Sequence, residues 1–188
     1  MQYQPVMLFN KATLLPALLY LIPSAIIWLL LKSLSGRTAI YSILSLPGTM
    51  LHEFLHLLVG TLTNAKPVSF SLLPKMDGSS RLVLGSVGFA NLRWYNAMPT
   101  CLAPLLGVYV IVLVAAHRIG NGYIYQNMDI AIWCLLAPQF SSMWPSLTDW
   151  KVSLKSWPVY LTGMLLLLLV SSSKLPMESA KAFIVRVF

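Results

Sequence analysis

Long apolar runs separated by short polar connections constrain the fold of this chain more than any other feature. The 188 residues are 57% hydrophobic and only 10% charged, with a mean hydropathy of +0.75. A soluble domain carries about 25% charged residues, whereas a membrane helix needs about 20 consecutive apolar residues. The sequence therefore predicts an all-α, multi-pass integral membrane protein of the cell membrane, forming a single membrane-embedded domain over residues 1–188.

Five segments have the length and composition expected of membrane helices. The first contains Pro16 and Pro23, which membrane helices tolerate where neighbouring groups satisfy the freed carbonyls. The only long polar interval between the segments covers residues 64–96. The predicted crossings are 14–34, 39–62, 97–116, 128–144 and 157–170.

The polar interval 64–96 is too polar to span a membrane and too long to be a simple turn. Residues 68–72 alternate apolar and polar side chains, Asp77 and Gly78 form a dipeptide typical of hairpin turns, and 81–87 is a second candidate strand. We therefore predict a small β-hairpin between the second and third membrane helices.

The net charge of +8 does not indicate a nucleic-acid partner. The thirteen basic residues are scattered over connections and ends, without the basic stripe and interleaved aromatics of a nucleic-acid surface. Anionic lipid headgroups of the bilayer are the simpler partner, and Trp144, Trp150 and Trp157 are expected in an interfacial aromatic belt. Cys101 and Cys134 lie in apolar stretches and are interpreted as small core residues.

The second predicted helix contains the chain's one chemically distinctive motif, Leu-His-Glu-Phe-Leu-His at residues 51–56. A spacing of four residues places His52 and His56 on one helix face, where both imidazoles can bind one zinc ion. Glu53 would be the general base, which takes a proton from zinc-bound water and passes it to the leaving amine. The alternative is that the three side chains only form hydrogen bonds between helices, although burying three ionisable groups without a metal is hard to offset.

A catalytic zinc site usually has three protein ligands, and Asp149 is the predicted third ligand. This residue follows the fourth predicted crossing, on the face towards which the motif-bearing half of helix two points. His117 and Asp129 are expected at the opposite face, Glu178 lies in the tail, and Asp77 belongs to the hairpin turn. The alternative for Asp149 is a helix N-cap or a solvated loop carboxylate.

With these residues the chain resembles the site-2 protease family of intramembrane metalloproteases. The resemblance covers roughly residues 40–155: the His-Glu-x-x-His motif, the strand-forming interval after it, the third helix, and an Asp that follows a Pro at the end of helix four. It implies a zinc metalloendopeptidase in which His52, His56 and Asp149 bind the metal and Glu53 is catalytic. Its substrates would be membrane-spanning or membrane-associated proteins, including leftover signal peptides.

The chain also departs from that family's pattern. Family members commonly show Asn and Pro ahead of an Asp-Gly pair, whereas here Pro145 lies four residues before Asp149 and Trp150 follows it. No PDZ-like insertion is present, so the resemblance is to a small, divergent member. The oligomeric state is not predicted.

Three other functions remain open from the sequence. A metalloprotease with its zinc at the aqueous surface would usually use a Glu as third ligand, and no suitable Glu is present. A catalytically silent membrane scaffold or binding subunit could hold a structural metal. A transporter that uses the motif as an ion relay would typically carry polar residues in several helices, whereas here they are concentrated in one.

Overall fold

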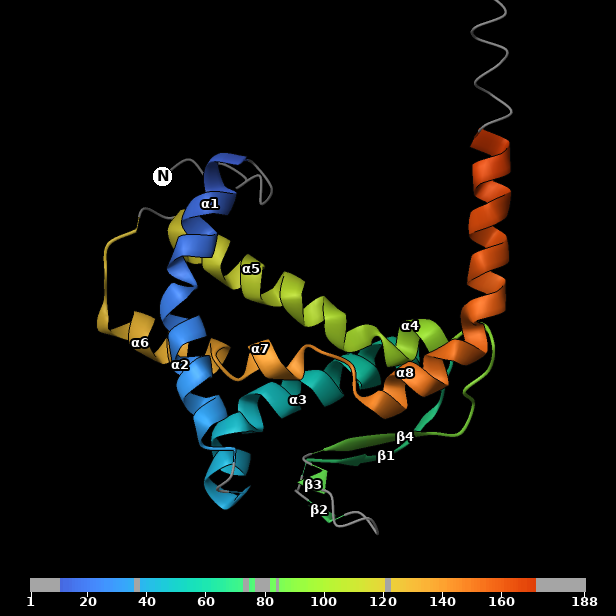
Figure 1. The fold of residues 1–188 in the computed structure, drawn as a ribbon, viewed down its shortest axis with the longest axis horizontal. Helices are drawn as coiled ribbons and strands as arrows, with labels where there is room; N and C mark the ends of the chain where they lie inside the picture. Colours follow the sequence, from blue (N-terminus) through green and yellow to red (C-terminus); the bar gives the residue numbers. More distant parts are fainter. Residues whose placement is uncertain are drawn as a thin grey trace, which may run out of the picture.

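The computed structural model describes residues 11–35, 38–72, 75–76, 82–83, 85–120 and 123–171 (Figure 1). This part of the chain is mostly helical, as predicted. It contains four segments long and apolar enough to cross a membrane: Leu14–Ser33, Ile40–Leu62, Ala103–Gly120 and Leu147–Ser171. Large aliphatic side chains are exposed along all four, as suits contact with lipid. These features support membrane association, with four candidate spans in the described residues in place of the five predicted.

The first span is a broken helix. It consists of α1 (Lys11–Tyr20) and α2 (Ile22–Ser33), with Pro16 inside α1 and Pro23 in the first turn of α2. A proline lacks a backbone N–H and clashes with the preceding turn, so a break at Leu21 is expected. The core of the described structure lies where α1 packs against α5 and α6, and it contains Ala17, Tyr20, Leu21, Ile111, Ala115, Ala116 and Leu136.

The second span, α3 (Thr38–Leu62), carries the His-Glu-x-x-His motif and contacts β1, β4 and most of the other helices. After α3 the chain turns sharply, with Asn64 and Lys66 in the left-handed backbone region at φ 58° and 54°. The Asn91 side chain donates to the Asn64 carbonyl at 2.7 Å and holds this turn against the strand that returns to it.

The predicted hairpin is confirmed as two short antiparallel pairs. Strand β1 (Pro67–Ser71) pairs with β4 (Ser86–Phe89), and β2 (Lys75–Met76) pairs with β3 (Leu82–Val83). The predicted Asp77–Gly78 turn lies outside the described residues. Strand β4 packs directly on α3, where the Phe89 ring lies against Gly60.

The predicted third crossing, 97–116, is not one continuous helix. It begins with α4 (Ala97–Cys101), passes through the 3₁₀ turn η1 (Ala103–Leu105) and continues as α5 (Leu106–Gly120). Pro104 lies in the interruption and explains it, because proline cannot donate to the preceding turn.

The predicted fourth crossing, 128–144, is wrong as a single span. The chain forms α6 (Asn127–Leu136), breaks at Pro138 and continues as the four-residue α7 (Gln139–Ser142). The predicted fifth crossing, 157–170, is the end of a longer helical run that begins with α8 (Leu147–Ser153) and the 3₁₀ turn η2 (Leu154–Ser156). Its last part, 157–171, stands apart from the rest of the molecule in Figure 1.

Candidate metal centre

The two motif histidines lie one turn apart on α3, with their Nε2 atoms 3.1 Å from each other. The Nδ1 atom of each ring forms a hydrogen bond with a backbone carbonyl of another helix. The Nδ1 of His56 bonds to the Thr100 carbonyl in α4 at 2.8 Å, and the Nδ1 of His52 bonds to the Ser142 carbonyl in α7. These two helices therefore set the orientation of both imidazoles.

The carbonyl partners decide which ring nitrogen carries the proton. A carbonyl oxygen can only accept, so Nδ1 is the donor in both rings and each neutral imidazole keeps its lone pair on Nε2. Two lone pairs that face each other at 3.1 Å need a cation or a proton between them. A donor bond from the outer ring nitrogen to a carbonyl is also how proteins orient histidines that ligate metals.

Asp149 approaches the same point from α8. Its Oδ1 lies 3.4 Å from His56 Nε2, and its Oδ2 lies 3.8 Å from His52 Nε2. Two ligands at about 2.05 Å from a tetrahedral metal ion are about 3.3 Å apart, so the spacing fits a metal of that size. His52, His56 and Asp149 can therefore hold a metal ion, with all three ligand atoms within 4.8 Å of one another.

Asp149 also belongs to a capping box, in which Ser146 and not Asp149 is the N-cap residue of α8. Its Oδ2 accepts from the Ser146 backbone N–H at 2.8 Å and from the Ser146 hydroxyl at 2.6 Å, while Ser146 Oγ accepts from the Asp149 N–H at 3.1 Å. This capping box occupies one carboxylate oxygen and leaves Oδ1 directed at His56. The two roles are compatible because they use different oxygens.

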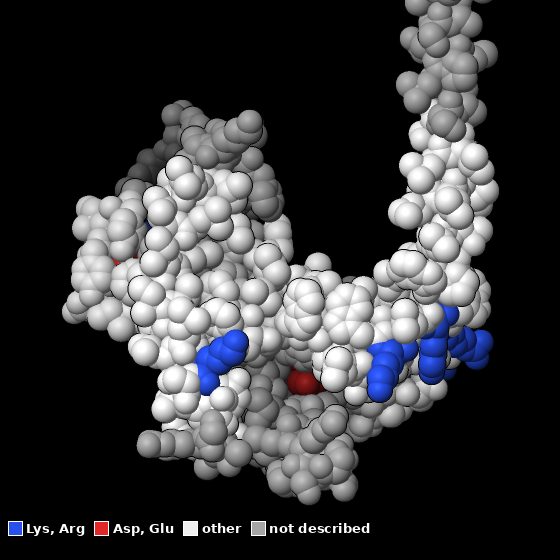
Figure 2. Space-filling view, in the orientation of Figure 1, with Lys and Arg blue, Asp and Glu red and all other residues white. Residues whose placement is uncertain are grey.

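Glu53 lies beside the three candidate ligands and is only 6% exposed. Within the described residues no group donates a hydrogen bond to its carboxylate, which lines a cavity of about 560 Å³ bounded by α3, β4 and the α7–α8 region. The Gly85 backbone lies directly against it: a Cβ at Gly85 would be 2.8 Å from Glu53 Cγ. Figure 2 shows acidic atoms set back in a hollow of the surface.

Gly48 explains how α7 comes close enough to orient His52. A Cβ at this position would lie 2.7 Å from the Pro138 carbonyl oxygen and would also meet the Ser142 hydroxyl. Only a glycine allows α7 to pack this tightly on α3. The sequence did not point to the carbonyls of Thr100 and Ser142, because backbone carbonyls carry no motif.

Asp129 and His117, which the sequence placed away from the motif, lie outside the candidate centre. Asp129 is fully buried, accepts from Arg118 Nε at 2.8 Å and Nη2 at 3.0 Å, and accepts from the Tyr20 hydroxyl at 2.8 Å. Burial opposes its ionisation, but hydrogen bonds from the Gln126 N–H and Arg118 outweigh burial and hold the pKa of Asp129 below its usual value. This cluster ties α1, α5 and α6 together.

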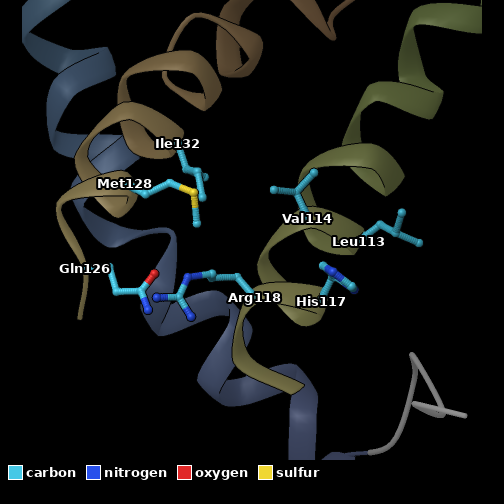
Figure 3. Close-up of a pocket in the computed structure, with 7 residues that line it drawn as sticks. All are labelled: Leu113, Val114, His117, Arg118, Gln126, Met128 and Ile132. Carbon is cyan, nitrogen blue, oxygen red and sulfur yellow. The ribbon is translucent and has the colours of Figure 1, made fainter. Parts of the chain in front are cut away.

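A separate pocket lies beside that cluster (Figure 3). Its lining is mainly apolar, and His117 and Arg118 project from successive positions of α5 in different directions. Because Arg118 forms an ion pair with Asp129, the described residues that line this pocket do not form a convergent set of catalytic groups.

Cys101 lines the cavity of the candidate centre, just before the span that begins at Ala103. Burial raises the pKa of its thiol to about 12, so the side chain is uncharged at neutral pH.

Comparison of the chain with protein-family models, with curated proteins and with solved structures found no match. The interpretation of the centre therefore depends on the geometry of the chain's own residues.

Proposed function

We propose that this chain is an intramembrane zinc metalloendopeptidase of the site-2 protease type. The observation that carries the proposal is the convergence of three lone-pair donors, the Nε2 atoms of His52 and His56 and the Oδ1 of Asp149, beside a buried carboxylate. Two imidazoles and one carboxylate form a donor set that suits zinc and leaves a fourth position open for water or substrate.

A zinc ion held by these three residues would act as a Lewis acid. A bound zinc ion would lower the pKa of a water molecule and polarise the carbonyl of the peptide bond to be cleaved. Glu53 is next to His52 in sequence and lines the same cavity, so its carboxylate would accept the water proton and then deliver it to the leaving amine. The carbonyls of Thr100 and Ser142 keep both imidazoles in the tautomer that ligation requires.

The substrate would be a membrane-spanning or membrane-associated protein, or a leftover signal peptide. A helical substrate hides its peptide bonds in internal hydrogen bonds, so cleavage requires a segment that unwinds. In the described part of the chain β4 pairs on one side only, with β1, and Ser86 and Val87 line the cavity. An unwound segment could therefore pair with the free edge of β4 and present its backbone to the centre.

The proposal is tested with purified protein in membranes, a panel of single-span substrates and a measurement of bound zinc. Glu53→Gln is expected to keep its zinc and to lose about 10²-fold or more of the cleavage rate, because the general base is gone. Asp149→Ala is expected to lose both zinc and cleavage, because a ligand is gone.

Asp129→Asn is a suitable control, because it changes a buried carboxylate in a different part of the molecule and should keep zinc in the folded protein. A wild-type protein that binds no zinc and cleaves no better than Glu53→Gln would reject the enzyme. Normal function of the protein after Glu53→Gln, with zinc retained, would favour a scaffold with a structural metal.

A further inference from the structure

The cavity beside the candidate centre has two chemically different ends. On the side of the N-terminal half of α3 its walls carry hydroxyl groups, from Tyr41, Ser45, Thr49, Ser141 and Ser142. Four other lining residues carry no charge and no hydroxyl group: Phe89, which packs on Gly60 beyond His56 on α3, and Leu92, Cys101 and Val152.

We infer that this apolar end is a specificity subsite, which binds an apolar side chain of the substrate next to the bond that is cleaved. The inference rests on the proposed function and adds to it the chemical class of residue that the centre selects. Three features of the structure place these residues beside the ligand atoms.

The first two features come from α4 and α8. Cys101 directly follows Thr100, whose carbonyl is bonded to His56 Nδ1 at 2.8 Å. Val152 lies one turn after Asp149 on α8, so the two side chains share a helix face. The same helices that position a candidate ligand therefore also supply a wall of the subsite.

The third feature comes from β4. The Phe89 ring packs on Gly60, one turn after His56, where an added Cβ would lie 3.0 Å from Phe89 Cζ and 3.2 Å from Cδ1. The absence of a side chain at Gly60 lets the ring approach α3 this closely. The width of the subsite consequently depends on Gly60 as well as on the four lining residues.

An apolar subsite of this kind favours an aliphatic side chain, because burial removes apolar surface from water and leaves no polar wall atom unpaired. A difference of about one methylene in such a pocket changes selectivity roughly 10- to 200-fold. A leucine-like side chain should therefore be preferred over a serine-like one by about tenfold or more.

The test uses binding of small zinc-chelating probes to the full chain, loaded with zinc in lipid nanodiscs, so it does not require cleavage. The probes are acetohydroxamate, which has no side chain, and the hydroxamates of N-acetyl-leucine and N-acetyl-serine. Wild type should bind the leucine probe about tenfold more tightly than the serine probe. Cys101→Phe, which fills the subsite, should abolish this preference between the leucine and serine probes.

Cys134→Phe is the matched control, because Cys134 is exposed on α6 and lines none of the cavity. It should keep the wild-type preference. Should Cys101→Phe fail to fold, Val152→Ala provides the second variant, and it should shift the preference from the leucine probe towards the hydroxamate of N-acetyl-phenylalanine.

Equal zinc-dependent binding of the leucine and serine probes to wild type would overturn the inference and leave the metal centre standing. Lack of zinc-dependent acetohydroxamate binding would instead reject the proposed centre, and the inference with it.

Discussion

At the residue scale, the informative side chain is Asp149, which a capping box orients towards the two histidines. Ser146 holds Oδ2 through its backbone N–H and its hydroxyl, which leaves little freedom for the carboxylate to rotate. Groups that orient a ligand typically change metal affinity 10- to 100-fold when they are removed. Ser146 is therefore expected to contribute to the candidate centre although it binds no metal itself.

Ser146→Ala should weaken zinc binding about tenfold or more, because the hydroxyl that restrains Asp149 is lost. It should also cost about 1 kcal/mol of stability through the lost cap. Competition with a chelator of known zinc affinity measures the first effect. Ser146→Thr retains a hydroxyl and should restore most of the affinity, and an unchanged affinity in Ser146→Ala would contradict the orienting role.

At the element scale, the contact between α3 and α7 determines whether the motif can function as a site. The spacing of His52 and His56 alone places two imidazoles on one face of a helix. Their orientation comes from α4 and α7, which reach α3 through the Thr100 and Ser142 carbonyls. Gly48 allows α7 that approach.

Gly48→Ala should lower both thermal stability and zinc affinity, because its methyl group would overlap the Pro138 carbonyl and push α7 away from α3. Overpacking of this kind costs about 1–3 kcal/mol. Thermal unfolding in detergent and zinc content of the purified protein are the measurements.

Gly163→Ala is the control for this substitution, since a Cβ there meets nothing within 4 Å. That variant should be as stable as wild type or slightly more stable, because alanine favours helices. Equal stability of Gly48→Ala and wild type would show that α7 is not constrained at this point.

At the scale of the whole molecule, exposed cations and aromatic rings gather at one end. Lys66 and Arg93 lie close together, because the Ala90 N–H donates to the Lys66 carbonyl at 2.9 Å and the side-chain oxygen of Asn91 accepts from Arg93 Nε at 2.7 Å. α8 and η2, which carry Lys151 and Lys155, pack on α4 at the same end. Basic residues also cluster at one end of the face seen in Figure 2. Exposed rings at this end are Trp94, Tyr95, Trp150, Trp157 and Tyr160.

Cations mixed with interfacial aromatics favour anionic lipid headgroups. Replacing Lys66 and Lys155 together by Gln should reduce the enrichment of phosphatidylglycerol around the protein several-fold in mixed phosphatidylcholine nanodiscs. Mass spectrometry of the retained lipids measures this. Lys32→Gln removes a cation that lies over the Trp28 ring elsewhere, and it should have a smaller effect. Equal retention of phosphatidylglycerol by wild type, the Lys66 and Lys155 double variant and Lys32→Gln would contradict binding of anionic headgroups at this end of the molecule.

The sequence by itself was sufficient to predict a mostly helical, membrane-type chain with a hairpin after the second helix. Hydropathy and residue periodicity are local properties, and they report directly on whether a segment can be a membrane helix or a strand. The breaks at Leu21 and Pro138 and the count of four candidate spans were harder to predict, because membrane helices tolerate proline and the packing of neighbours decides where a helix ends.

The tertiary structure alone decided which distant groups meet. The sequence predicted His52, His56 and Asp149 as ligands with Glu53 as base, and the fold brings the first three together, while their ligand and catalytic roles stay predictions. The carbonyls of Thr100 and Ser142 and the proposed apolar subsite could not be read from the sequence. Backbone carbonyls are chemically the same at nearly every residue, so only the path of the chain determines which of them faces an imidazole.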